Sequence, residues 1–444
     1  MSIKADLKQR VRAEIEAHAD EIIAFSDAVM RHPEPGYAEY ATAERVTAWW
    51  DRLGVPYQAG IGRTGVKARL PGGGDGPTVA ILGELDAVPV PDHPLADPET
   101  GAAHACGHHA QLAAMVGVGI GLRNVMPELS GSVVLFAVPA EEFAEIDRRL
   151  ALRDRREIEF PVGKAELLRL NAFDDIDLAM QVHTAGSGAP RFSVGDTTNA
   201  GALVRARFLG QAAHAGSRPW DGRNAFKAAT LAVQALDAQR ETFADRDTVR
   251  VNPVLTQVDA VPGVVPASAR LEVLVRARTL DALRETCGKV ERALRAGALA
   301  LDVSLESETL LAYLPLSSAP SLDALVAANA EAVIGSAVRT TRRHLTACTD
   351  MGDLGYVMPV SHPYSSGAVG QAHSPSFQVT DHREAAVEPA VYLAMTVVDL
   401  LIAGAPVARR IIAEAKPRPP LREYLALRRS LNSRISWAPG QGVS

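Results

Sequence analysis

Five short segments of the sequence gather residue types that bind metal ions or move protons. In chain order they are 83–89 (GELDAVP), 104–109 (HACGHH), 139–143 (PAEEF), 181–184 (QVHT) and 370–375 (GQAHSP). Imidazole, thiolate and carboxylate are the groups from which proteins build zinc and other divalent-metal sites. We therefore expect a metal site wherever the fold brings these segments together.

The segment 104–109 is the strongest of the five, with four Cys or His residues in six positions. Cys106 and His108 stand two residues apart just before a predicted helix, whose N-terminus lowers the pKa of a nearby thiol. A thiolate beside an imidazole suits a borderline-soft divalent metal. The alternative for this segment is a buried structural cysteine beside exposed histidines.

Carboxylates occupy two of the other segments. Glu141 and Glu142 follow an apolar run, so that one can bind metal while the other transfers a proton. Glu84 and Asp86 can ligate a metal or orient a ligating imidazole. Each pair alone is equally compatible with solvated charges or a turn cap. Together with the histidines, they favour a one- or two-metal hydrolase in which metal-bound water is the nucleophile.

Composition and missing motifs narrow the class of protein. The 444 residues carry 46 Lys and Arg against 52 Asp and Glu, a net charge of −6, so the sequence predicts no nucleic-acid partner. It contains no HExxH zincin pair, GxSxG elbow or Walker loop. No uninterrupted apolar run has the roughly 20 residues of a membrane span. Three cysteines make no disulfide framework, and we expect a cytoplasmic α/β protein with a small-molecule substrate.

The elements that must position these side chains alternate between strands and helices. Apolar runs at 78–85, 132–138 and 178–182 predict buried strands, and 110–125 predicts a helix between the first two. This alternation predicts a mixed, mostly parallel sheet covered by helices. The candidate segments fall at the ends of its strands, where open α/β sheets build their sites.

The middle of the chain predicts a second domain. Strands are expected at 202–208, 248–258, 269–278 and 301–308, and helices at 224–239 and 280–296. Their order, βαββαβ, is the ferredoxin-like α+β unit. We therefore predict a catalytic α/β domain of residues 1–192 and 311–444, interrupted by an inserted lid domain of residues 193–310. The tail from Lys416 is predicted to be a surface appendage.

With these segments in order, the chain resembles the metal-dependent amidohydrolases of the aminoacylase–carboxypeptidase family, which includes hippurate hydrolase, auxin-conjugate hydrolases and aminobenzoyl-glutamate hydrolase. HACGH at 104–108, PAEE at 139–142 and GQAAHAG at 210–216 look like the family's metal-binding, glutamate-pair and lid-histidine motifs. The likeness runs from HPEPGYAEYATAE at 32–44 to the last long helix. It implies a zinc-exopeptidase-like domain with a ferredoxin-like lid, and a homodimer formed through that lid, with a higher oligomer as the alternative.

Carried over position by position, the resemblance implies two divalent ions per chain, Mn²⁺ or Zn²⁺. The implied metal ligands are Cys106, His108, Glu142, His183 and His373. Glu141 would be the general base, which takes a proton from the bridging water and passes it to the leaving amine. Asp86 would orient the ligands from behind, and His214 would polarise the scissile carbonyl oxygen from the lid.

Several positions depart from the simple aminoacylases. His109 and Gln111 stand where hippurate-hydrolase-type relatives have Asp and His. Asp350 lies in a segment, TDMGD, that also differs. We predict that His109 contacts the substrate and that Asp350 contacts the substrate or the metal. Arg276 matches a position where relatives keep an arginine suited to a carboxylate, with Arg278 or a surface role as the alternative.

These features make hydrolysis of the amide C–N bond of a small N-acyl or N-aroyl amino-acid-like compound the leading hypothesis. A variant is hydrolytic deamination of an electron-poor aromatic amine, for which His109 is the only motive in the sequence. A hypothesis from another class is a non-catalytic metal-binding relative, although every matched ligand and the base Glu141 are present. The segment 143–174, longer than in simple aminoacylases, is expected to narrow the pocket beside Glu142.

Overall fold

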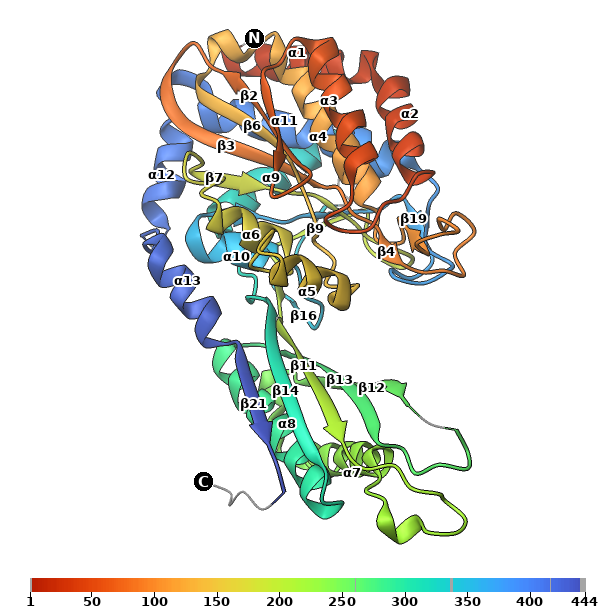
Figure 1. Cartoon of the computed structure of the whole chain (residues 1–444). Helices are drawn as coiled ribbons and strands as arrows, with labels where there is room; N and C mark the ends of the chain where they lie inside the picture. The colour runs from red at the N-terminus through yellow and green to blue at the C-terminus, as the bar shows by residue number, and fades with distance from the viewer. Residues whose placement is uncertain (1, 260, 336–337, 416, 440–444) are drawn as a thin grey trace. The chain divides into compact units, whose positions relative to one another are not determined.

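The computed structural model describes residues 2–259, 261–335, 338–415 and 417–439, which fold into two compact units (Figure 1). The first unit comprises Met1–Thr197, Ser317–Arg343 and Asp353–Pro419. The second comprises Thr198–Leu316, His344–Gly352 and Pro420–Ser444. The residue range of the predicted insertion, 193–310, therefore nearly matches the longest segment of the second unit. The predicted division is wrong for 344–352 and for the tail from Pro420, which belong to the second unit as well.

The first unit is built on a six-stranded sheet of order β1-β2-β6-β3-β7-β17. Its strands are β1 (Tyr57–Ile61), β2 (Gly65–Pro71), β3 (Gly74–Glu84), β6 (Ser130–Val138), β7 (Leu178–Met180) and β17 (Val360–Ser361). β3 runs parallel to β6 and β7, and β17 runs parallel to β7, whereas β2 is antiparallel to β6 and β1. The prediction of a mixed, mostly parallel sheet with helices is confirmed.

Smaller sheets complete the strands of this unit. They contain β4 (Val88–Pro89) with β5 (Ala102–Ala103), β19 (Ala368–Val369) with β20 (Gln378–Val379), and a four-stranded sheet of β15 (Val338–Thr340), β9 (Phe192–Val194), β18 (Tyr364–Ser365) and β8 (His183–Thr184). The short element β10 (Thr197–Thr198), which pairs with β16 (His344–Leu345), and α10 (Met351–Val357) lie where the chain passes between the units.

Several helices accompany the large sheet in this unit. They are α1 (Ile3–Ala17), α2 (Ala19–Met30), α3 (Tyr40–Leu53), α4 (His108–Arg123), α5 (Ile146–Asp154), α6 (Gly163–Arg169), α9 (Pro320–Ile334), α11 (Glu388–Leu401) and α12 (Pro406–Glu414). α4 is buried from His108 to Leu122 and contacts β3, α1, α2 and α11. A Cβ at Gly117 or Gly121 would come within 2.7 Å of side chains of α11 or α1, so glycine permits this close packing. The packing fixes the position of His108 at the start of α4.

One helical segment of the described chain, Arg383–Gly404, is long and apolar enough to cross a membrane by length and composition. It consists of a π-helix (Arg383–Val387), α11 and a 3₁₀ turn (Ile402–Gly404). Its most apolar window is 89% buried within the protein. The buried Asp399 bonds with Lys8 and Asn329. The segment is therefore buried to the extent expected of a helix in a protein core.

The second unit is a five-stranded antiparallel sheet of order β12-β13-β11-β14-β21 that carries two helices. The elements β11 (Ala200–Leu209), α7 (Ala225–Asp237), β12 (Arg250–Val258), β13 (Ser268–Ala277), α8 (Leu280–Ala300) and β14 (Ser304–Tyr313) follow the predicted βαββαβ order. Alternating burial along β13 places its apolar side chains against the helices. The predicted ferredoxin-like lid is thus present as a unit of its own.

The tail is part of this sheet and is not the surface appendage that its basic composition suggested. It forms α13 (Leu421–Ser430) and β21 (Ser433–Trp437), which pairs with β14 (Figure 1). The fully buried Arg428 donates hydrogen bonds to the carbonyl oxygens of Leu311 and Ala312. β21 therefore covers an edge that β14 would otherwise expose.

Candidate metal centre

The structure brings the predicted segments together in the first unit. β3 ends at Glu84, β6 leads into Glu141, β7 leads into His183, and α4 begins at His108. Because β3, β6 and β7 are parallel, their carboxyl ends meet at one edge of the sheet. The loop with His373 joins them, since its backbone N–H donates to the carbonyl oxygen of Ala105 at 2.8 Å.

Two groups of candidate ligand atoms share Cys106. One contains Cys106, His108 and His183, the other Cys106, Glu142 and His373, and within each the ligand atoms lie within 4.8 Å of one another. The sulfur of Cys106 lies 3.3 Å from Nε2 of His183 and 3.4 Å from Nε2 of His373. All five ligands implied by the resemblance are therefore in one cluster, with the thiol at its centre.

Buried polar atoms of this cluster suit a cation. Nε2 of His108 and Oε1 of Glu142 are buried, and neither forms a hydrogen bond within the part of the chain that the structure describes. Oε1 of Glu142 is 3.0 Å from Nε2 of His373. Buried polar atoms without partners are rare because they are costly. A divalent ion would satisfy both atoms, so the donor set fits a metal.

The electrostatics of the cluster favour anionic donors. Burial and the charge of Glu142 raise the pKa of the Cys106 thiol, but the neighbouring histidines outweigh them and lower this pKa to about 6. Burial also raises the pKa of Glu142, while His373 lowers it more strongly, to about 2. Near neutral pH both groups are therefore ready to bind a cation, since metal ligands must be deprotonated.

Asp86 connects two parts of the centre from behind. Its backbone carbonyl accepts a hydrogen bond from Nδ1 of His108 at 2.8 Å, and its carboxylate accepts one from the backbone N–H of Glu142 at 2.9 Å. Because a carbonyl only accepts, Nδ1 carries a proton and Nε2 is the nitrogen left for a metal. The orienting role of Asp86 stays a prediction, and these contacts are compatible with it.

Glu39 is a buried residue of the site whose role the sequence did not reveal. Its carboxylate accepts hydrogen bonds from the backbone N–H of Ala140 at 2.8 Å and from the hydroxyl of Thr64 at 2.6 Å. Ala140 has a φ of 52° in the turn directly before Glu141. Burial and the charge of Asp86 raise the pKa of Glu39 to about 7. Glu39 therefore holds the turn that presents the predicted base.

Replacing Glu39 by alanine is expected to destabilise the metal-free protein by about 1–3 kcal/mol, because two buried donors lose their acceptor. Turnover should fall as well, since the turn that carries Glu141 loosens. Thermal unfolding and initial rates measure the two effects. Glu39→Gln keeps one acceptor and should show a smaller loss. Equal stability of Glu39→Ala and the wild type would contradict this role.

The segment 143–174 contributes a second residue that the sequence analysis did not single out. It forms α5 and α6, and Gly163 donates its N–H to the carbonyl oxygen of Ala140 at 2.9 Å. The next residue, Lys164, is fully buried, with its Nζ 2.6 Å from Oε1 of Glu84. The only sign of this buried lysine in the sequence is its position between a glycine and an alanine. Narrowing of a pocket by this segment stays a prediction.

His109 does not occupy the predicted place. Its side chain is fully buried, and its ring packs 5.2 Å from the ring of His104 and 5.9 Å from that of His382. This burial argues against the predicted contact between His109 and the substrate, which stays a prediction.

The remaining predicted residues belong to the second unit. His214 is exposed, and its Nδ1 lies 3.1 Å and 3.2 Å from the backbone N–H groups of Gly216 and Ser217, which donate to it. A neutral ring then carries its proton on Nε2, as an oxyanion donor must. Arg276 is half-buried and lines a cavity of about 690 Å³ that Arg240 also lines. Asp350 is fully buried, which argues against a substrate contact.

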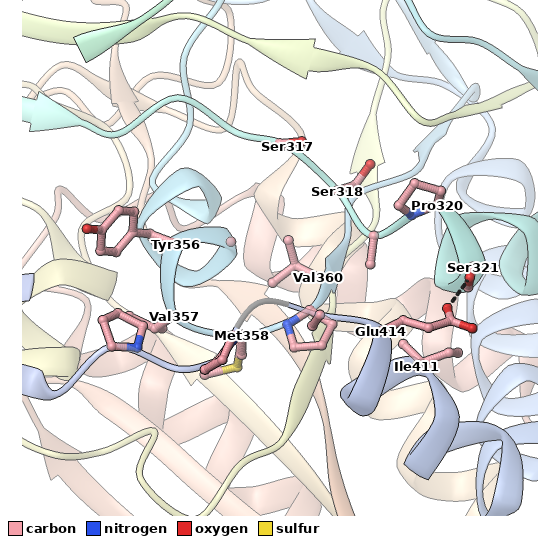
Figure 2. A pocket seen from close by; sticks show the side chains of 16 residues that line it. Ser317, Ser318, Pro320, Ser321, Tyr356, Val357, Met358, Val360, Ile411 and Glu414 are labelled. Carbon is pink, nitrogen blue, oxygen red and sulfur yellow. Dashed lines mark hydrogen bonds between the residues drawn. The ribbon is translucent and has the colours of Figure 1, made fainter. Parts of the chain in front are cut away.

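A separate cavity of the first unit, of about 540 Å³, contains none of the metal-centre residues in its lining (Figure 2). Ser318, Tyr356 and Met358 line it, together with the end of α12. Ser321 donates a hydrogen bond to Glu414 at one side of it, at 2.5 Å. The candidate chemistry therefore lies at the donor cluster and not in this cavity.

Comparison with known proteins identifies the family. Residues 80–399, more than half of the chain, match the peptidase family M20/M25/M40. The chain belongs to this family. It is 26% identical to the Xaa-Arg dipeptidase of Mus musculus over 430 residues, 89% of each protein. It is 31% identical to the indole-3-acetyl-aspartic acid hydrolase of Enterobacter agglomerans over 273 residues, 59% of this chain and 58% of that enzyme.

Solved structures of the M20 fold agree with the architecture described above. A putative aminohydrolase from Staphylococcus aureus superposes with a TM-score of 0.71 at 21% identity, over 88% of this chain and 99% of the other. The YXEP protein of Bacillus subtilis, a dinuclear metal-binding peptidase of the M20 family, gives 0.63 at 19% identity, over 86% and 98%. The chain has the M20 fold and is a metal-dependent hydrolase of this family.

Proposed function

We propose that this M20 enzyme binds two divalent ions per chain and hydrolyses the amide C–N bond of a small N-acyl or N-aroyl amino-acid-like compound. The observation that carries the proposal is Cys106, which belongs to both groups of candidate ligand atoms. The names of two relatives support the substrate class. One is the indole-3-acetyl-aspartic acid hydrolase. The other is the p-aminobenzoyl-glutamate hydrolase of Escherichia coli, one polypeptide of which is 29% identical over 62% of this chain and 61% of its own length.

The ligand types bear on which metal is bound. The thiolate of Cys106 favours zinc, while the carboxylate of Glu142 also tolerates manganese. Both ions are therefore included in the experiment that tests the proposal.

Glu141 is suited to move the proton. It is 6% exposed and its Oε2 lies 4.0 Å from Nε2 of His108, yet it belongs to neither ligand group that contains Cys106. Divalent ions, when bound, supply an acidified water and polarise the carbonyl. Glu141 then takes the proton of that water and returns it to the leaving nitrogen. His214, with its proton on Nε2, is proposed to donate to the carbonyl oxygen.

The alternative reactions have less support. Aromatic deamination was motivated by His109 alone, which has no exposed surface. A non-catalytic relative would have lost part of the site, whereas all five predicted ligands and Glu141 lie together here. Amide hydrolysis is therefore the function that the site supports best.

A screen of metal-stripped protein refilled separately with manganese and zinc tests the proposal. The panel contains N-acetyl and N-benzoyl amino acids, aminobenzoyl-glutamate, auxin conjugates, dipeptides and electron-poor anilines. Release of amino acid and of ammonia is scored separately. We expect metal-dependent release of an amino acid from at least one amide. Ammonia from an aniline, with every amide inert, would contradict amide hydrolysis.

The second unit supports a homodimer as part of the proposal. β12 is an edge strand of its sheet, and Val254 and Leu255 on it are 49% and 37% exposed. An apolar open edge can pair with another chain, whereas β21 covers the opposite edge. Light scattering should give a particle mass twice that of one chain. The Val254→Lys variant should have a lower particle mass. A monomeric wild type would contradict the dimer.

A further inference from the structure

A further carboxylate, that of Glu84, lies among the predicted metal ligands at the end of β3. It is 1% exposed, and its Oε2 is 3.0 Å from Nε2 of His108, the nitrogen left for a metal. Candidate ligand atoms of Glu84, His108 and Glu141 all lie within 4.8 Å of one another. Glu84 does not belong to the ligand set implied by the resemblance.

The contact between Glu84 and His108 is close without being a hydrogen bond. Nε2 of His108 has no hydrogen-bond partner among the described residues, although Oε2 of Glu84 is 3.0 Å away. Oε1 of Glu142 and Nε2 of His373, which belong to two predicted ligands, are likewise 3.0 Å apart. Two donors that bind one ion at about 2.0–2.2 Å are about 3 Å apart, and their lone pairs converge on the ion. Glu84 and His108 therefore have the geometry of two ligands of one ion.

The other side of the Glu84 carboxylate is held by buried donors. Oε1 accepts hydrogen bonds from Nζ of Lys164 at 2.6 Å and from Nε2 of Gln181 at 2.7 Å, while Oε2 accepts one from Nε2 of Gln111 at 2.9 Å. All three donors are fully buried. A carboxylate oxygen has two lone pairs, so Oε2 keeps one for a cation. The Lys164 ammonium balances the added negative charge beside Cys106.

We infer that Glu84 is an additional metal ligand, on the ion that His108 holds, and that Lys164 is its fixed counter-charge. This inference rests on the proposed two-ion centre, and it gives the two ions different numbers of protein ligands. Cys106, His108, His183 and Glu84 would then hold one ion. Cys106, Glu142 and His373 would hold the other, and three protein ligands are the pattern of a catalytic metal site.

Cobalt reconstitution of the whole protein tests the assignment. Wild type, Glu84→Gln and Glu166→Gln are stripped, refilled with Co²⁺, and compared by bound metal per chain and by the visible absorption of cobalt. Glu166 is the matched control, because it is a buried carboxylate of α6 that pairs with Arg169. We expect Glu84→Gln to bind one of the two ions at least about tenfold more weakly and to change the cobalt bands. Glu166→Gln should match the wild type.

Glu84→Gln leaves the buried ammonium of Lys164 without its counter-charge, which is strongly destabilising. The double variant Glu84→Gln with Lys164→Met removes both charges, so it serves if the single variant misfolds. It should show the same change in the cobalt bands. Unchanged bands in a folded variant, with or without weaker binding, would overturn the assignment and leave Glu84 as a positioning residue at most. A wild type that binds no cobalt would refute the two-ion centre itself, which distinguishes the two failures.

Discussion

Replacing Glu141 by glutamine is expected to lower kcat of the metal-loaded enzyme by about 100- to 10,000-fold, the usual contribution of a positioned general base. Glutamine keeps the shape of the side chain but cannot take a proton from water. Bound metal should stay at the wild-type level, because the role proposed for Glu141 is to take a proton and not to hold an ion. The measurements are kcat on the best amide of the panel and metal per chain in the same sample.

A matched control for this variant is available nearby. Glu145 lies in the same segment, and its carboxylate pairs with Arg148 at 2.9 Å, so Glu145→Gln should keep turnover close to that of the wild type. If Glu141→Gln kept its kcat within about tenfold of the wild type, Glu141 could not be the base.

Replacing Cys106 by alanine is expected to remove both ions and, with them, turnover. Cys106 is the shared member of the two ligand groups, so its loss removes one donor from each of them. Loss of a residue that only orients a ligand costs about 10- to 100-fold in metal affinity, and loss of a shared ligand should cost more at both sites. Metal analysis after dialysis against a dilute chelator measures the loss.

Cys287 provides the control for the cysteine substitution. Burial raises the pKa of its thiol to about 12, the opposite direction from Cys106, so it is a poor metal donor at neutral pH. Cys287→Ala should keep the wild-type metal content. Unchanged metal content in Cys106→Ala would remove this residue from the ligand set.

The ligands could be predicted from the sequence because their signals are local. Cys106 and His108 stand at the start of a helix, and Glu141 and His183 follow strands whose apolar runs are unmistakable. Parallel strands then bring their carboxyl ends together whatever the details of the loops. The order of residues along the chain was therefore enough to predict that these segments meet, whereas the resemblance to the amidohydrolases implied which of their residues are ligands.

Contacts between distant segments could not be predicted in the same way. Glu84 and Lys164 are 80 residues apart, and Glu39 and Ala140 are 101 residues apart. No local pattern distinguishes a buried, paired lysine from a solvated one. The carboxylates and the lysine acquire their roles only when the strands and α6 pack together.

Two predictions with which the structure agrees poorly have simple physical explanations. His109 follows a predicted ligand in sequence, but successive residues of an α-helix project about 100° apart, so His109 does not face where His108 faces. The basic composition of the tail predicted a surface appendage. Its strand β21 instead places Arg434 beside Glu308 at 2.9 Å and Trp437 opposite Leu305, which its charge alone did not indicate.

The measurement that tests the central claim most directly is the initial rate of amide hydrolysis as a function of bound metal per chain, with one sample titrated from the stripped to the loaded state. If hydrolysis depends on metal bound by the two ligand groups that share Cys106, the rate should be negligible without metal and should rise to a plateau at two ions per chain. A rate that did not change as metal was removed would contradict it.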